Sequence, residues 1–485
     1  LNAQFWADTD TDTDGIVYIE SESIDTNGGH LTFGENGQTA SVGGETILVG
    51  GDVFFQRSTS VQTLTTSGGE VNIYGETIVA NTNGLTIDSA NLIINLHGLL
   101  KFGNQYNAVE GTFTWEAARD DAKTVTDSYL ATITSRLENS IAGLAVDYQE
   151  SWLGGLRSEN TNEWSWVTEP GYDASTNPLV FFYQGQSTPT KSSTIETGGS
   201  TAPGYFANWN RWTEGQTSDN PEPNNASGGT ERALQFTGAQ GLWNDLPQNS
   251  TTLNWYVRET DLAASPVTII AGSGLVEISG GVGTSKALAS LDVTSNATTV
   301  NGNGLVTIGA QTFSSSLTVN SNTSSNTNVI LRAGVEDGIT AAGLITVFGE
   351  LIDIDANLTS TTTSGSGISI TGQRIIQDNG IDVTTSGADI SYTAANFVST
   401  AAEEDLILLN GSGANRALVN ANGGNIILAA NYSTGGTPGT SERSIRLMSA
   451  DLITSGAGEI SLTGDATNSG NTSQTAWGMQ ANDAK

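Results

Sequence analysis

Short apolar segments that alternate with polar residues recur over most of the chain. Each segment follows a turn of small residues, as at 28–33, 68–73 and 304–308. Alternation with a period of two, in β-branched residues bounded by Gly, Asn and Ser, predicts a strand, a turn and another strand. This pattern covers residues 1–103 and 262–485, the two flanks of the chain.

The spacing of the segments predicts a β-solenoid. Ile368 and Ile390, in the clearest copies, are 22 residues apart, which is about one coil. Such coils cannot bury their apolar face alone, so they must stack into a continuous core. A β-sandwich of many short strands is the alternative, but it would require more aromatic residues and proline-marked turns than the flanks contain. The flanks resemble the repeat regions of large bacterial exoproteins of the filamentous-haemagglutinin type. The resemblance implies a right-handed parallel β-helix at a cell surface, where such rods act as stalks, adhesins or matrix fibres.

Residues 104–261 have a different composition. Eight of the ten Trp lie between Trp115 and Trp255, and seven of the nine Pro lie between Pro170 and Pro247. We therefore expect a compact domain with an aromatic core, inserted between the two parts of the solenoid.

Two helices and several strands are predicted in the inserted domain. Residues 114–122 place apolar side chains on one helical face, and Ser135 with Glu138 forms an S-x-x-E capping box at the start of a second helix. Strands are expected at 152–156, 163–167, 233–236, 242–245 and 255–259, with loops over 168–230.

The strongly negative net charge of the chain limits the kinds of molecule that it can bind. The 51 Asp and Glu against 17 Lys and Arg give a net charge of -34. Such a charge repels phosphate backbones and anionic headgroups, so neither nucleic acid nor a membrane surface is expected as a partner. Hard cations that take oxygen ligands remain compatible with it. The absence of cysteine excludes disulfides, thiolate chemistry and a zinc site built on sulfur, and no run of about 18 apolar residues predicts membrane insertion.

Several motifs occur in a fixed order along the inserted domain. Together they resemble the C-type lectin-like domain, which implies an α+β fold of two helices, two small sheets and a long loop region that binds ligands through calcium. The motifs are Trp115 with Ala118, Leu130-Ala131-Thr132-Ile133, Trp152-Leu153-Gly154, Trp164-Ser165-Trp166, Glu222-Pro223-Asn224, Trp243-Asn244-Asp245 and Tyr256-Val257-Arg258-Glu259.

The resemblance implies a Ca2+ site and a carbohydrate site made of the same side chains. Their carboxylate and amide oxygens suit calcium, which takes about six to eight oxygens in irregular geometry. In the family the two coordination positions left open accept neighbouring hydroxyls of a sugar, and the Glu-Pro-Asn order favours mannose-type or glucose-type glycans. The alternative is that calcium only makes the loop rigid. The expected residues are Glu222, Asn224, Glu231, Asn244 and Asp245.

The chain also departs from the family. Ala122 and Arg258 stand at one pair of disulfide positions, and Ala233 stands at half of the other. The domain must therefore be held by its aromatic core, by calcium and by the anchorage of its ends. Asn225 and Arg232 stand where an additional calcium site would prefer acids, which puts a second ion in doubt.

Two further candidate sites have weaker signals. Asp10, Asp12 and Asp14 imitate the start of an EF-type calcium loop, but Ser21 stands where a bidentate glutamate should close it, and a solvated turn is the alternative. The only histidines lie in predicted solenoid strands, so a Ser/His/Asp arrangement has no base in the inserted domain and no enzyme is expected. A polysaccharide-cleaving β-helix is the open alternative.

Together these features predict an extracellular bacterial surface adhesin, a β-solenoid stalk that displays a calcium-dependent carbohydrate-binding domain. The alternative is a structural subunit of an extracellular filament, sheath or surface layer. In that case calcium and the lectin-like domain would mediate subunit contacts, and copies would associate end to end because an uncapped solenoid exposes unpaired strand edges.

Overall fold

The computed structural model divides the chain into two compact units. The first holds residues 1–7, 19–103 and 263–485, and the second holds 8–18 and 104–262. The residues that the structure describes are 3–5, 16–34, 39–42, 45–48, 52–56, 60–158, 163–166, 180–185, 199–201, 223, 230–237, 241–249, 251–262, 264–302, 304–321, 328–333, 338–395, 405–431, 443–465 and 477–482.

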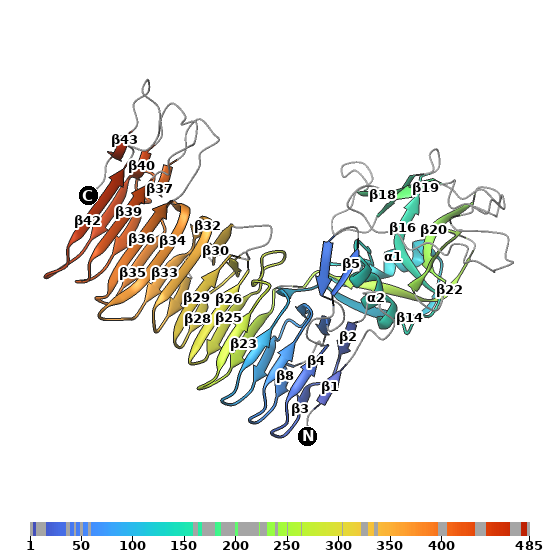
Figure 1. The fold of residues 1–485 in the computed structure, drawn as a ribbon. Helices are drawn as coiled ribbons and strands as arrows, with labels where there is room; N and C mark the ends of the chain where they lie inside the picture. The colour runs from blue at the N-terminus through green and yellow to red at the C-terminus, as the bar shows by residue number, and fades with distance from the viewer. Residues whose placement is uncertain are drawn as a thin grey trace. The chain divides into compact units, whose positions relative to one another are not determined.

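The first unit is a parallel β-helix, as the alternating pattern predicts (Figure 1). Its larger parallel sheet consists of β1 (Ala3–Phe5), β4 (Leu31–Phe33), β9 (Val71–Ile73), β12 (Ile94–Leu96), β24 (Leu275–Ile278), β26 (Ala297–Asn301), β27 (Gly304–Val306), β29 (Ser316–Asn320), β30 (Val329–Arg332), β32 (Ile345–Asp355), β34 (Ser366–Gln377), β36 (Asp389–Ala395), β37 (Asp405–Asn410), β39 (Ile426–Asn431), β40 (Arg443–Met448), β42 (Ile460–Asp465) and β43 (Trp477–Asn482).

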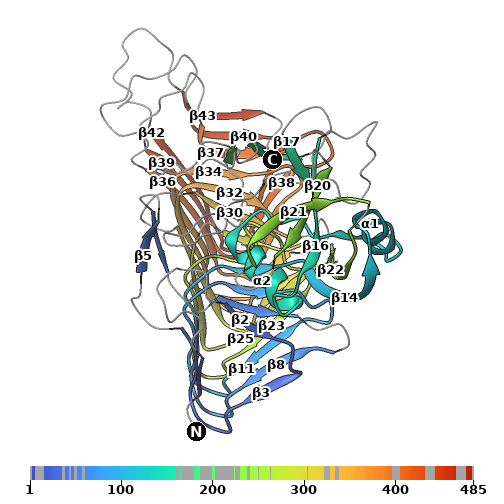
Figure 2. The ribbon, with the colours of Figure 1, turned by 90° about the vertical axis from the view of Figure 1, so that its right-hand side faces the viewer.

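A second parallel sheet forms another wall of the helix, and the coils lie one behind another in Figure 2. It consists of β3 (Ser23–Asp25), β8 (Gln62–Thr65), β11 (Leu85–Asp88), β23 (Pro266–Ile270), β25 (Ser290–Thr294), β28 (Gln311–Phe313), β31 (Gly338–Ala341), β33 (Asn357–Ser360), β35 (Asp382–Thr385), β38 (Ala417–Asn420) and β41 (Ala450–Ile453). A smaller sheet contains β2 (Ile16–Ile19), β7 (Asp52–Phe55), β10 (Thr77–Val79) and β13 (Leu100–Phe102), and β5 (Thr39–Val42) pairs with β6 (Glu45–Leu48).

Stacked columns of inward side chains form the core of the β-helix. Ile345, Ile368, Ile390 and Ile426 follow one another in register across β32, β34, β36 and β39, and all four are buried. Every second side chain of a strand points into the β-helix. In-register stacking of the coils places these inward side chains above one another, and the resulting apolar columns fill the interior.

The coils pair directly across the insertion. β11 pairs with β23 and β12 pairs with β24, both in parallel, although the inserted residues separate the two members of each pair in sequence. The core column therefore continues from Leu85 to Val267 without a break. The second unit is therefore inserted between two consecutive coils, and the strands on either side of the insertion still pair with each other.

The second unit combines a mixed sheet with two helices, so the predicted inserted α+β fold is confirmed. Its first and last strands pair antiparallel, which brings the two ends of the insertion together. The elements are β14 (Gln105–Phe113), α1 (Trp115–Ala122), β15 (Ser128–Leu130), α2 (Arg136–Ala145), β16 (Ser151–Arg157), β17 (Glu163–Trp166), β18 (Val180–Gly185), β19 (Gly199–Thr201), β20 (Glu231–Phe236), β21 (Trp243–Pro247) and β22 (Leu253–Thr260).

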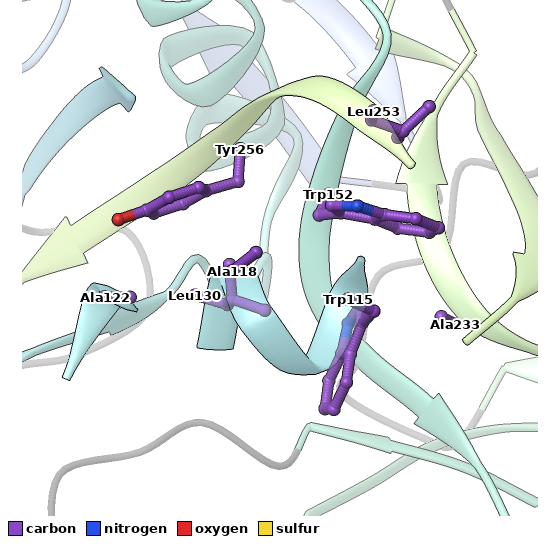
Figure 3. Close-up of a cluster of buried hydrophobic side chains, with 8 residues drawn as sticks. All are labelled: Trp115, Ala118, Ala122, Leu130, Trp152, Ala233, Leu253 and Tyr256. Carbon is purple, nitrogen blue, oxygen red and sulfur yellow. The ribbon is translucent and has the colours of Figure 1, made fainter. Parts of the chain in front are cut away.

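A cluster of buried side chains holds α1 against the strands (Figure 3). Thr114 caps the helix by accepting a hydrogen bond from the backbone N–H of Ala117 at 3.3 Å. Trp115 and Ala118 project from α1 into this cluster, which Figure 3 shows together with Trp152.

The second helix begins at the predicted cap. Ser135 accepts a hydrogen bond from the N–H of Glu138 at 3.2 Å, but the Glu138 carboxylate accepts from the N–H of Thr134 at 2.6 Å rather than from Ser135. The capping box is therefore shifted by one residue on its return side. Among the described residues, no helix has the length and the apolar character needed to cross a membrane.

Candidate functional site

Three of the five predicted calcium ligands lie on the antiparallel pair β20–β21. Glu231 is the first residue of β20, and Asn244 and Asp245 follow Trp243 on β21. Glu231 and Asp245 are 7% and 2% exposed, while Asn244 is half-buried. Buried carboxylates must be paired with a cation or with hydrogen-bond donors, so this pair of strands is a candidate cation site.

Trp243 fixes the strand that carries two of these side chains. Its Nε1 donates to Oδ1 of Asn139 on α2 at 2.8 Å, and its ring meets that of Trp166 edge to face, with centroids 5.8 Å apart. The indole is fully buried. It therefore positions β21 and offers no face to a sugar.

The register separates the two neighbouring ligands on β21. Asp245 lies opposite Leu234 and Asn244 lies opposite Gln235, so the side chains of Asn244 and Asp245 leave opposite faces of the regular strand. The buried Oε1 of Gln235 has no hydrogen-bond partner among the described residues. An irregularity of register between Glu231 and Ala233 interrupts the alternation on β20.

A buried arginine brings Glu231 and Asp245 into one electrostatic cluster. Arg157, at the end of β16, donates from Nε and Nη2 to the backbone oxygen of Glu231 at 3.2 and 2.9 Å. Burial lowers the pKa of Arg157, the carboxylates of Asp245 and Glu231 act to raise it, and nearby Arg232 acts to lower it. Arg232 in turn donates from Nε to the backbone oxygen of Arg157 at 2.9 Å.

The remaining predicted ligands lie outside the described residues. These are Glu222 and Asn224 on either side of Pro223, and the three aspartates Asp10, Asp12 and Asp14. Pro223 itself is described and is buried. The complete five-residue set therefore stays a prediction, and the structure shows the geometry of three of its members.

The described side chains suit calcium in chemical type. Two carboxylates and the amide oxygens of Asn244 and Gln235 are the hard donors that calcium prefers, with no thiolate or imidazole among them. Both carboxylates lie near enough to Arg157 to act to raise its pKa.

A second acidic cluster lies on the β-helix and has no counterpart in the sequence-based predictions. Carboxylate oxygens of Asp353, Asp355 and Asp378 lie within 4.8 Å of one another, close enough to hold a metal ion. Arg332 donates from Nε to Asp355 at 3.0 Å. The signal in the sequence is a spacing of 23 residues from Arg332 to Asp355, repeated to Asp378, which is one coil each time.

Hydrogen bonds and a guanidinium also link the members of this cluster to one another. A hydrogen bond with Asp355, together with burial, raises the pKa of Asp378 to about 6. Burial opposes ionisation of Asp355, but its hydrogen bonds with Asp378 and Arg332 prevail and lower its pKa. The three residues Arg332, Asp355 and Asp378 therefore form a polar ladder that links successive coils.

Comparison with known proteins gives limited matches. No protein-family model matches the chain. Over 72 residues, or 14% of this chain, the sequence is 35% identical to halomucin of Haloquadratum walsbyi, and the matched stretch is 1% of that protein's length. Among solved structures, the chain is similar to the C-type carbohydrate-recognition domain of cow CD23, determined in the presence of a GlcNAc2Man3 oligosaccharide. That similarity covers 33% of this chain and 89% of the CD23 domain, with 20% sequence identity and a TM-score of 0.22.

Proposed function

We propose that this chain is part of an extracellular surface protein in which a parallel β-helix displays a calcium-dependent carbohydrate-binding domain. The surface location follows from the resemblance of the flanks to exoprotein rods. Binding, rather than catalysis, is the activity proposed for the inserted domain.

One observation carries the proposal: the β20–β21 pair presents the two buried carboxylates of Glu231 and Asp245 on neighbouring strands. Burial of a charge is costly unless a cation or hydrogen-bond donors compensate it, so two buried acids on neighbouring strands favour a cation site here. The Trp-Asn-Asp sequence on β21 is the position at which the C-type lectin-like family carries calcium ligands.

Each residue has a defined part in this mechanism. Glu231, Asn244 and Asp245 would hold the ion together with Glu222 and Asn224, and Trp243 fixes the position of β21. Because a regular strand turns Asn244 and Asp245 to opposite faces, β21 would have to depart from regular geometry there for both side chains to reach one ion. Calcium, when bound, would supply two coordination positions for vicinal sugar hydroxyls. The carboxylate oxygens would then accept hydrogen bonds from the same hydroxyls, and the Glu222-Pro223-Asn224 order favours mannose-type or glucose-type sugars.

Isothermal titration with mannosides, in calcium and in EDTA, tests the proposal on the full chain. We expect binding in calcium and none in EDTA, with binding lost in Glu231→Gln and in Asp245→Asn. Glu110→Gln is the matched control, because Glu110 is an exposed acid on β14 of the same domain. No calcium-dependent binding to any glycan on an array would refute the function.

A second candidate, a subunit of a filament or surface layer, is favoured by the exposed face of β42. Ile460 is 44% exposed although Ile426, next to it in the same core column, is fully buried. A further coil from a second copy would cover Ile460. Negative-stain imaging at high concentration in calcium tests this idea, and separate particles without end-to-end contacts would refute it.

A further inference from the structure

A buried amide on α2 contacts the segment that carries two of the proposed calcium ligands. Asn139 is 5% exposed, and its side-chain oxygen Oδ1 accepts a hydrogen bond from Nε1 of Trp243 at 2.8 Å. Its Nδ2 donates to the backbone oxygen of Gly241 at 3.2 Å. Both contacts fall directly before Asn244 and Asp245 in the chain, so one side chain on α2 fixes the entry to β21 at two points.

The two hydrogen bonds explain why an amide stands at this position. The indole N–H of Trp243 can only donate and the carbonyl of Gly241 can only accept, so the side chain between them must offer an acceptor and a donor together. Asparagine offers both on one short side chain. An ionised carboxylate offers only acceptors, and an apolar side chain offers neither.

Asn139 and Gly241 lie in close contact. Gly241 has a φ of +61°, in the left-handed region that favours glycine, and a Cβ at this position would come within 2.7 Å of Asn139 Nδ2. The first turn of α2 is itself fixed, because Ser135 accepts from the N–H of Glu138 and the Glu138 carboxylate accepts from the N–H of Thr134. The amide therefore reaches β21 from a helix whose start is capped.

We propose that Asn139 is a positioning residue of the calcium site. It acts through Trp243 and Gly241 to set the position of Asn244 and Asp245, rather than as a ligand itself. Loss of a side chain that orients metal ligands commonly weakens metal binding by about 10–100-fold. The inference rests on the proposed function only in treating Asn244 and Asp245 as calcium ligands.

A purely structural role of Asn139 would have a different consequence. If Asn139 only joined α2 to β21, its removal would lower the Tm of the domain and leave the calcium affinity of the folded protein unchanged. If it positions the ligands, the calcium affinity falls even where the domain is fully folded. Measurement of calcium binding well below the Tm therefore separates the two roles.

Calcium titration calorimetry of the full chain, without sugar, provides this measurement. Asn139→Leu keeps the approximate size of the side chain and removes both hydrogen bonds, and we expect it to bind calcium about 10-fold more weakly than the wild type. Trp243→Phe keeps a buried ring and removes the donor to Asn139 Oδ1, so we expect a smaller loss in the same direction. This second variant keeps the test valid if Asn139→Leu does not fold.

Ser135→Ala is the matched control. Ser135 caps the same helix, and its side chain bonds the N–H of Glu138 rather than the entry to β21. Its loss should lower the Tm by about 2–4 °C and leave the calcium affinity unchanged. Near-UV circular dichroism follows the unfolding of the inserted domain, because eight of the ten Trp lie between Trp115 and Trp255.

Hydrogen exchange of the calcium-free protein, followed by mass spectrometry, gives a second readout. Amides of β21 should exchange faster in Asn139→Leu than in the wild type, because the local opening of this strand becomes easier, and Ser135→Ala should leave their exchange unchanged.

An unchanged calcium affinity in Asn139→Leu would overturn the inference, and so would an equal loss of affinity in Ser135→Ala. A silent glycan array with a wild-type chain that binds calcium would refute carbohydrate binding alone, because the titration requires no sugar. A wild-type chain that takes up no calcium would contradict both proposals.

Discussion

The buried Glu259 makes the stability of the inserted domain depend on pH. Its Oε1 accepts hydrogen bonds from Asn104 Nδ2 at 2.6 Å and from the Tyr106 hydroxyl at 3.3 Å, and its Oε2 accepts from the backbone N–H and hydroxyl of Thr132 at 2.8 and 2.9 Å. It thereby joins both ends of the domain to the segment after β15. Burial, assisted by repulsion from Glu138, raises its pKa to about 7 against the lowering effect of these hydrogen bonds.

The sign of the effect follows from proton binding. The native domain holds the Glu259 proton up to about pH 7, whereas the unfolded chain releases it near the ordinary value of 4.5. Between these values the native state binds more protons, so the free energy of unfolding falls as pH rises. A difference of about 2.5 pKa units corresponds to about 3 kcal/mol, fully present below pH 4.5 and lost above pH 7.

Glu259→Gln should remove this dependence, because glutamine resembles the protonated acid. Its oxygen can keep the two hydrogen bonds from Thr132, and its NH2 group can face Asn104 and Tyr106 if the Asn104 amide turns to present its oxygen and the Tyr106 hydroxyl rotates to accept. We expect the variant to match the wild type near pH 5 and to be more stable than the wild type by up to about 3 kcal/mol at pH 8.

Urea unfolding of the full chain from pH 4 to 9, followed by near-UV circular dichroism, measures the difference. Other ionisable groups near Glu259 are Glu138, Tyr106 and Tyr129. Glu138→Gln should flatten the pH profile only in part, and Glu110→Gln, the exposed control, should leave it unchanged. An identical pH profile for Glu259→Gln and the wild type would refute the reasoning.

Three further predictions concern single side chains. Trp152→Ala removes a fully buried indole and should cost about 3–5 kcal/mol in urea unfolding by near-UV circular dichroism; a cost below about 1 kcal/mol would contradict the packing described. Ser135→Ala removes the N-cap of α2 and should cost about 1 kcal/mol in the same assay, and an unchanged midpoint would show that the cap is dispensable. Arg332→Gln should lower the stability of the β-helix by at most about 1 kcal/mol, because the arginine side chain is 52% exposed. Its low-pKa partner Asp355 is neutralised as pH falls, so thermal unfolding by far-UV circular dichroism should show a loss at pH 7 that shrinks in acid, and a constant loss would exclude the ion pair as its cause.

The β-helix could be predicted from the sequence because alternation marks the inward positions. Ile368 and Ile390, the basis of the 22-residue spacing, pair directly across β34 and β36. The lengths of individual strands could not be predicted. β32 and β34 run for 11 and 12 residues, because polar side chains such as Thr346 can point outward anywhere along a coil and do not mark its corners.

The candidate site was predictable only where a motif marks it. Trp243-Asn244-Asp245 identified β21, and Ser135 identified the start of α2. Arg157 belongs to no motif, and its contact joins residues 74 positions apart that become neighbours only when β16 lies beside β20. A short pattern in the sequence cannot show such a contact, although the scarcity of bases makes any buried one informative.

The inserted domain contains no cysteine and therefore no disulfide. Hydrogen bonds from buried aromatic side chains connect its separate segments instead. Trp115 Nε1 donates to the carbonyl of Leu153 at 2.7 Å, and Trp152 Nε1 donates to the carbonyl of Phe113 at 2.8 Å. At Ala122, where the resemblance to the C-type lectin-like domain implies a disulfide position, the neighbouring Asp121 accepts a hydrogen bond from the hydroxyl of Tyr256 at 2.6 Å and so ties α1 to β22.

These bonds can replace much of what a disulfide would contribute. Each contributes about 1 kcal/mol, and with the bond from Trp243 to Asn139 four of them approach the roughly 2–4 kcal/mol of one disulfide. They also satisfy polar groups that would otherwise be buried at a cost. All four join backbone or side-chain atoms of the protein itself, so these links form from the chain alone.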